Sequence, residues 1–138
     1  MLGRLCRYLR LCGIDTQYSN EGLKTLLIAK KENRIVLTRN THLKNRDGVF
    51  YIETEDLTTQ LKTVIEKFEL RNQLNSFSRC LLCNEPLIFV EKDKVKKRIP
   101  FYTYKNFNEF AECPKCGRVY WKGSHYKNMV NKIKQLIG

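Results

Sequence analysis

The sequence predicts a mixed α/β protein in which a parallel sheet with flanking helices is followed by a small cysteine-bearing module and a C-terminal helix. Apolar patterns typical of helices and strands alternate over residues 1–68, which favours a parallel sheet covered by helices. Two Cys-x-x-Cys pairs follow in residues 79–138. The 138 residues, 42% hydrophobic and 29% charged, suffice for one domain or two small ones and exclude a fibrous or disordered chain.

The first predicted helix covers residues 1–12, and Gly13 ends it. One stripe of this helix consists of Leu2, Leu5, Cys6, Leu9 and Cys12. The opposite stripe consists of Arg4, Arg7 and Arg10. Residues 15–18 suit a short strand. Residues 21–31 suit a second helix, whose leucines are available for packing.

Two more strands and a third helix complete the alternation. The apolar run 34–38 suits a buried parallel strand, and 49–53 is the next strand along the chain. A helix capped by Thr54 or Asp56 then runs to about Phe68, with apolar residues at helical spacing.

The chain is therefore expected to contain an α/β domain over 1–70, a polar linker over 71–78 and a cysteine module over 79–138. Within the module we expect three strands, at 87–90, 101–104 and 118–121. The basic run 92–98 separates the first two strands. The closing helix has one apolar face, formed by Tyr126, Val130, Ile133 and Ile137.

The spacing of four cysteines is the most specific signal in the chain. Cys80-Leu-Leu-Cys83 and Cys113-Pro-Lys-Cys116 are separated by 29 residues, the layout of a four-thiolate Zn²⁺ site in a zinc ribbon. Such a site is structural, because four thiolates leave no position for water. Disulfides or redox pairs are the alternative. Cys6 and Cys12 are expected to be small buried side chains of the first helix.

The charge of the chain favours a polyanionic partner. Lys and Arg number 26 against 14 acids, for a net charge of +12, and the calculated pI is about 9.6. Residues 1–78 have 13 basic and 9 acidic side chains, whereas 79–138 have 13 and 5. Nucleic acid is therefore the leading candidate partner, and the C-terminal part carries most of the excess.

We expect no membrane association and a cytoplasmic location. No uncharged apolar run approaches the roughly 18 residues of a membrane span. Arginines interrupt the N-terminal apolar stretch, which argues against a secretory signal. The same arginine-rich, acid-free pattern is also found in mitochondrial transit peptides, although the segment is poor in serine.

Three strings together resemble one family. They are Met1-Leu-Gly-Arg-Leu-Cys-Arg-Tyr-Leu-Arg-Leu-Cys-Gly13, Arg34-Ile-Val-Leu-Thr-Arg-Asn40, and the pair Arg79-Cys-Leu-Leu-Cys-Asn84 with Cys113-Pro-Lys-Cys-Gly-Arg-Val-Tyr-Trp-Lys-Gly-Ser-His125. The chain is similar to the Mut-seven C-terminal RNase family, in which a PIN-like nuclease domain precedes a zinc ribbon. The resemblance implies a protein that acts on RNA and descends from a metal-dependent ribonuclease.

The sequence departs from the family pattern at the acidic positions. The strand with the first catalytic aspartate, which in the family precedes the first helix, is absent from this chain. Asn40 stands where the family has aspartate, and Glu21 is a loose match to a third acid. The resemblance therefore implies a degenerate catalytic site at Glu21 and Asn40, with weak Mg²⁺ or Mn²⁺ binding unless Asp15, Asp47 or a partner chain contributes.

The missing strand has a structural consequence as well. Its absence leaves a sheet edge or a hole beside the first helix, which a partner subunit can cover.

The expected RNA-binding residues are mostly basic and cluster in the cysteine module. Lysines of the run 92–98 would track phosphates, although a solvated hairpin is the alternative. Ser124 and His125 are expected at the start of the closing helix, where N–H groups bind anions; alternatively, His125 packs on Trp121. The full set is Arg4, Arg7, Arg39, Lys92, Lys94, Lys96, Lys97, Arg98, Arg118, Lys122, Ser124 and His125.

Three functional hypotheses follow. The first is an RNA-binding protein of the Mut-seven C-terminal type that acts as a metal-dependent ribonuclease. The second is a non-catalytic RNA-binding or ribonucleoprotein-associated factor that kept the scaffold and lost the acids. The third is a protein-interaction module built on the zinc ribbon.

Overall fold

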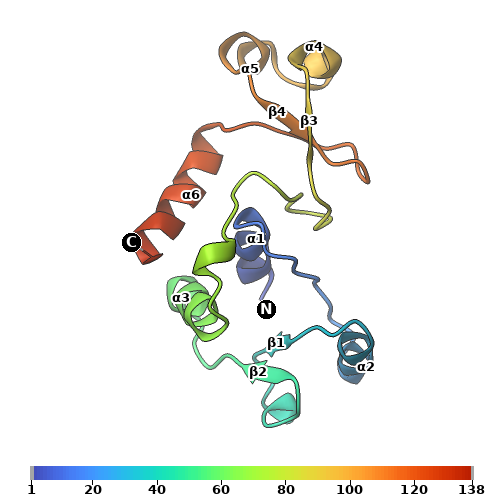
Figure 1. Ribbon diagram of the computed structural model, residues 1–138, viewed down its shortest axis with the longest axis vertical. Coiled ribbons are helices and arrows are strands. Elements are labelled where there is room, and N and C mark those ends of the chain that lie inside the picture. Colours follow the sequence, from blue (N-terminus) through green and yellow to red (C-terminus); the bar gives the residue numbers. More distant parts are fainter. Residues whose placement is uncertain (1, 138) are drawn as a thin grey trace.

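The computed structural model describes residues 2–137 and has two sheets, one in each half of the chain (Figure 1). The first half contains α1 (Gly3–Leu11), α2 (Leu23–Lys31), β1 (Val36–Thr38), the 3-10 turn η1 (Thr41–Leu43), β2 (Val49–Tyr51), α3 (Leu57–Lys67) and η2 (Arg71–Gln73). The second half contains β3 (Ile88–Val90), α4 (Lys92–Val95), η3 (Lys96–Arg98), α5 (Phe101–Asn106), β4 (Phe110–Glu112), β5 (Val119–Tyr120) and α6 (Ser124–Ile137). This mixed α/β architecture, with its C-terminal helix, confirms the predicted fold class.

The core of the first half lies between α1, α3 and the sheet. β1 and β2 pair in parallel, with Val36 opposite Val49 and Thr38 opposite Tyr51, as the alternation predicts. The core itself consists of Leu5, Leu9, Ile52, Leu57, Leu61 and Val64. Burying each such side chain stabilises the fold by about 1.5–3 kcal/mol.

Asp56 is the residue that starts α3. Its carboxylate accepts a hydrogen bond from the Thr59 N–H at 2.9 Å, so it satisfies one of the amides that the first helical turn leaves free. Of the two predicted caps, Asp56 is therefore the correct one.

The predicted strand at 15–18 is wrong. The backbone of Thr16 is hydrogen-bonded to side chains instead of a neighbouring strand: its carbonyl accepts from Arg10 Nε at 2.8 Å, and its N–H donates to Asn84 Oδ1 at 3.0 Å. The local pattern suits an extended chain, but its partners come from elsewhere in the fold.

The second helix also differs from the expectation. It begins at Leu23, so Glu21 lies before the helix instead of in its first turn. Its leucines pack little, since Leu23 is 60% and Leu27 is 72% exposed and Ala29 is the buried residue of the helix.

The second half is built on an antiparallel sheet in the order β3-β4-β5, and Phe110 of β4 forms a buried core cluster with Val95 and Ile99. Residues 101–104, predicted as a strand, form helix α5. Pro100 precedes the helix, where its fixed φ and missing N–H are tolerated. The middle strand of the sheet is instead formed by β4.

The basic run 92–98 is not a loop between strands. It folds into α4 and η3, and Val95 from this run is fully buried.

Helix α6 follows the second sheet in sequence but packs on the first half (Figure 1). Its Met129 and Ile133 form a core cluster with Leu11 and Cys12, which lie at the C-terminal end of α1. Cys6 and Cys12 are both buried, as predicted.

Polar contacts tie the two halves together beside α1. Arg10, which was expected on an exposed stripe, is 7% exposed and donates from Nη1 to the carbonyls of Leu81 at 2.8 Å and Leu82 at 3.1 Å. The Asn84 amide donates to Asp15 at 2.6 Å. Burial of the Arg10 charge is tolerated because these carbonyls accept its hydrogen bonds.

We expect Gly13→Ala to destabilise the protein strongly. Gly13 has φ +84°, and an added Cβ would lie 2.5 Å from the carbonyl oxygen of Asn75. Gly48→Ala is the matched control, because Gly48 has φ +74° with no atom within 4 Å of the added Cβ. We expect Gly48→Ala to lose about 1 kcal/mol and Gly13→Ala at least about 2 kcal/mol more in urea unfolding. Equal losses would contradict the close approach.

Asp15 makes the junction sensitive to acid. Burial raises the pKa of this carboxyl, but hydrogen bonds from Arg34 and Asn84 and the charge of Arg34 outweigh burial, so the pKa lies below 3.8. A depressed pKa stabilises the fold above the unfolded value of about 3.9, and this contribution is lost as the pH falls through the folded pKa.

Asp15→Asn should therefore cost about 1 kcal/mol at pH 6, and this cost should shrink as the pH falls through the folded pKa of Asp15. Unfolding free energies measured against pH test this. Asp47→Asn, which alters an exposed carboxylate, is the control. A cost for Asp15→Asn that does not change with pH would show that the carboxylate charge is not what matters.

Candidate metal centre and nuclease-type site

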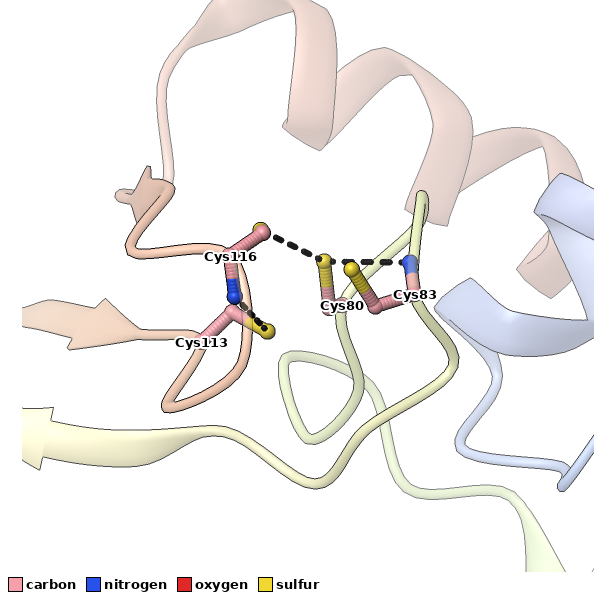
Figure 2. A group of neighbouring side chains, drawn as sticks. All are labelled: Cys80, Cys83, Cys113 and Cys116. Atoms are coloured by element: carbon pink, nitrogen blue, oxygen red, sulfur yellow. Dashed lines mark hydrogen bonds between the residues drawn. The ribbon is translucent and has the colours of Figure 1, made fainter.

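The four cysteines of the two Cys-x-x-Cys pairs converge at one point (Figure 2). Their Sγ atoms all lie within 4.8 Å of one another, and those of Cys80 and Cys116 are 3.8 Å apart. A tetrahedral zinc ion with Zn–S bonds of about 2.3 Å holds its sulfurs roughly 3.8 Å apart. The cluster therefore fits a single tetrahedral metal ion and is consistent with structural zinc.

The two pairs form knuckles of the same geometry. In the first, the Cys83 N–H donates to Cys80 Sγ at 3.4 Å; in the second, the Cys116 N–H donates to Cys113 Sγ at 3.4 Å. Each knuckle then turns through a left-handed residue, Asn84 with φ 68° or the glycine that follows Cys116 with φ 76°. Short tight turns with these N–H···S bonds present both sulfurs of a pair on one side.

The residue that sequence reasoning missed at this site is Tyr120. Its hydroxyl lies 3.1 Å from Cys80 Sγ and accepts the Leu81 N–H at 3.1 Å, which leaves its proton for the sulfur. Burial raises the pKa of Cys80, but hydrogen bonds from Tyr120 and from the backbone of Cys83 and Leu82 lower it to about 7. The environment therefore favours the thiolate, the form that binds metals.

The cluster cannot carry four thiolates without a cation. The pKa of Cys83 is raised to about 12, first by hydrogen bonding with Cys116 and then by burial and the charge of Cys80. The pKa of Cys113 is also raised, mainly by burial. A bound divalent ion would supply the positive charge that lets all four sulfurs ionise.

Arg98 links the second knuckle to the neighbouring strand β4. Its guanidinium contacts both carboxylate oxygens of Glu112, at 3.2 and 3.1 Å, and donates to the Gly117 carbonyl at 2.9 Å. This expected RNA-binding residue thus has a structural task within the ribbon.

The candidate catalytic residues lie on two separate segments. Asn40 is the second residue after β1, and its Oδ1 accepts the His42 N–H at 2.9 Å, so the side chain caps the η1 turn. Glu21 is exposed in the segment before α2. Among residues 2–137 the four cysteines are the only group of three or more acidic, histidine or cysteine side chains placed to share a metal ion.

Arg39 lies beside Asn40 at the carboxyl end of β1. Its guanidinium donates to the Glu53 carbonyl at 3.0 Å and approaches Glu55 at 3.5 Å. Glu53 and Glu55 come shortly after β2, and Asn40 comes shortly after β1. Parallel strands end at the same edge of a sheet, so all three residues follow strands at that edge. Their position at the end of a predicted parallel strand is the sequence signal that could have identified Glu53 and Glu55 as neighbours of Arg39 and Asn40.

The expected RNA-binding lysines divide into two groups. The ammonium groups of Lys92 and Lys96 lie over the Tyr104 ring, 4.6 and 5.1 Å from its centroid, and Lys122 pairs with Glu109 at 3.4 Å. The other expected basic side chains are exposed and form no ion pair among the residues described: Arg4, Arg7, Lys94, Lys97 and Arg118.

Ser124 and His125 begin α6, and both are exposed. Gly123, rather than Ser124, precedes the helix and accepts the Lys127 N–H at 2.9 Å. Ser124 and His125 therefore lie in the first turn of α6, as expected, and Gly123 occupies the position before it. Trp121 packs near Phe110, with ring centroids 6.4 Å apart, which supports a structural role for this aromatic residue.

A family comparison agrees with this arrangement. The family model described as the Mut7-C RNAse domain matches residues 1–133. The chain belongs to the Mut7-C RNase domain family. The Mut7-C match spans both the α/β half and the cysteine cluster, and it supports a nuclease-like or RNA-related role. Searches of curated proteins and of solved structures find no match. No helix in the described part of the chain is long and apolar enough to cross a membrane.

Tyr120→Phe should weaken zinc binding about 10- to 100-fold, because it removes the hydroxyl that donates to Cys80. Titration against a chromophoric chelator measures this affinity, and the wild-type chain should bind one zinc ion. The control is Tyr102→Phe, since Tyr102 is 72% exposed on α5. Unchanged zinc affinity in Tyr120→Phe would mean that the hydroxyl does not tune the site.

Proposed function

We propose that this Mut7-C protein binds RNA through the basic surface of its C-terminal half. The proposal rests on the family match over residues 1–133, together with a net charge of +12 that is concentrated in the half with the cysteine cluster. Lysine and arginine contacts to phosphates supply most of the affinity of non-specific RNA binding. The zinc-bound knuckles would hold this surface in place, a structural task for the metal.

The candidate catalytic residues bear on whether the protein cleaves RNA. The family resemblance supports metal-dependent cleavage, for which Glu21 and Asn40 are the residues carried over. The side-chain oxygen of Asn40 is used to cap η1, and this contact favours the second candidate, an RNA-binding factor without cleavage activity. A divalent ion prefers clustered carboxylate oxygens, which an amide replaces poorly.

A single assay separates these candidates. Labelled single-stranded RNA of mixed sequence is titrated with protein in 1 mM Mn²⁺, by anisotropy for binding and on denaturing gels for cleavage. We expect binding whose affinity falls steeply with salt, by a slope of about −0.7 per phosphate neutralised. No binding at low salt would contradict the proposal.

Glu21→Gln provides the test of catalysis, with Glu69→Gln, at an exposed glutamate after α3, as its control. Cleavage that only Glu21→Gln removes would establish the ribonuclease. Intact RNA with unchanged binding would establish the non-catalytic factor.

A further inference from the structure

A shallow cleft of about 250 Å³ runs between α6 and the segment before the first knuckle. Its polar and basic lining comprises Ser76, Lys122, Tyr126, Lys127, Asn131 and Lys134. Positions 127, 131 and 134 are four and three residues apart, so these side chains share one face of the helix. The cleft therefore has a cationic wall about two helical turns long.

The charges of this wall are only partly compensated. Lys122 pairs with Glu109 at 3.4 Å, whereas Lys127 and Lys134 form no ion pair with any residue that the structure describes. Two ammonium groups without an acidic partner suit an anionic ligand rich in acceptor oxygens, such as a phosphate.

Aromatic rings continue from the cleft to the surface of the ribbon. The Phe77 ring lies 5.4 Å from Tyr126 and 6.0 Å from Phe89, and the Lys122 ammonium lies 5.2 Å from its centroid. Phe77 is buried, whereas Phe89 on β3 is 74% exposed. Such exposure of a phenyl ring beside a cationic cleft leaves a flat apolar face available for stacking.

Phe89 also lines a second hollow, of about 360 Å³, with Asn108 and Glu109. The two hollows adjoin at the ion pair between Lys122 and Glu109, because each contributes one partner. An aromatic platform with amide and carboxylate groups thus lies next to a phosphate-sized cationic cleft.

We propose that this surface binds single-stranded RNA, with phosphates in the cleft of Lys127 and Lys134 and a base stacked on Phe89. Stacking requires an unpaired base, because bases of a duplex are already stacked on one another. The proposal rests on the RNA binding proposed above and adds the strand type and the contact residues.

The lysines are tested by Lys127→Gln/Lys134→Gln. Its control is Lys24→Gln/Lys31→Gln, which removes the same charge from two exposed lysines at the same spacing on α2. With single-stranded RNA as the probe, the α6 variant should reduce the magnitude of the salt slope by about 1.4, for two lost phosphate contacts. The α2 variant should leave the slope unchanged. Equal slopes for the two variants would overturn the assignment of the cleft.

The stacking platform is tested by Phe89→Ala, with Phe101→Ala, a 75% exposed phenylalanine on α5, as the control. Phe89→Ala should weaken binding of single-stranded RNA roughly tenfold and leave binding of a duplex of equal length unchanged. Equal effects on single strand and duplex, or no effect, would overturn the platform.

Two outcomes distinguish a failure of this surface assignment from a failure of the RNA binding proposed above. If wild-type protein binds RNA and neither variant differs from its control, the surface is wrong while RNA binding stands. If wild-type protein binds no RNA at low salt, both proposals fail. Competition by polyglutamate as effective as RNA at equal charge would assign the cleft to an acidic protein and overturn the RNA assignment.

Discussion

The convergence of four cysteine sulfurs is the constraint on which the second half of the chain depends. The strands of its sheet have two or three residues, and its buried core cluster consists of Val95, Ile99 and Phe110. So small a core stabilises little by burial alone, and small modules commonly require a metal or disulfides. A metal ion held by both knuckles would join segments 29 residues apart and fix the sheet between them.

The same knuckles orient the two halves of the protein. Asn84, the left-handed residue of the first knuckle, is bonded to Asp15 and Thr16, and the neighbouring carbonyls accept from Arg10. On the other side, α6 returns from the ribbon to pack Met129 against α1. The cysteine cluster is thus connected to the α/β half through the first knuckle on one side and through α6 on the other.

The basic residues of the ribbon are not equivalent, although sequence composition treats them alike. Arg98 and Lys96 are engaged with Glu112 and Tyr104, where they stabilise the fold. Lys127 and Lys134 have no acidic partner within residues 2–137 and face a cleft. Net charge favours a polyanionic partner, whereas the internal pairing decides which cations would remain available to it.

The sequence by itself determined the features set by local spacing. The two knuckles follow from Cys-x-x-Cys turns, and α1, α3, β1 and β2 follow from apolar periodicity. Tertiary structure decided the rest, because the partners lie far apart in the chain. Thr16 bonds to Asn84 instead of a strand, Pro100 precedes a helix in a segment of strand-forming residues, and Phe77 meets both Phe89 and Tyr126 only after folding. Such non-local contacts leave no periodic trace in the sequence, so pattern alone cannot predict them.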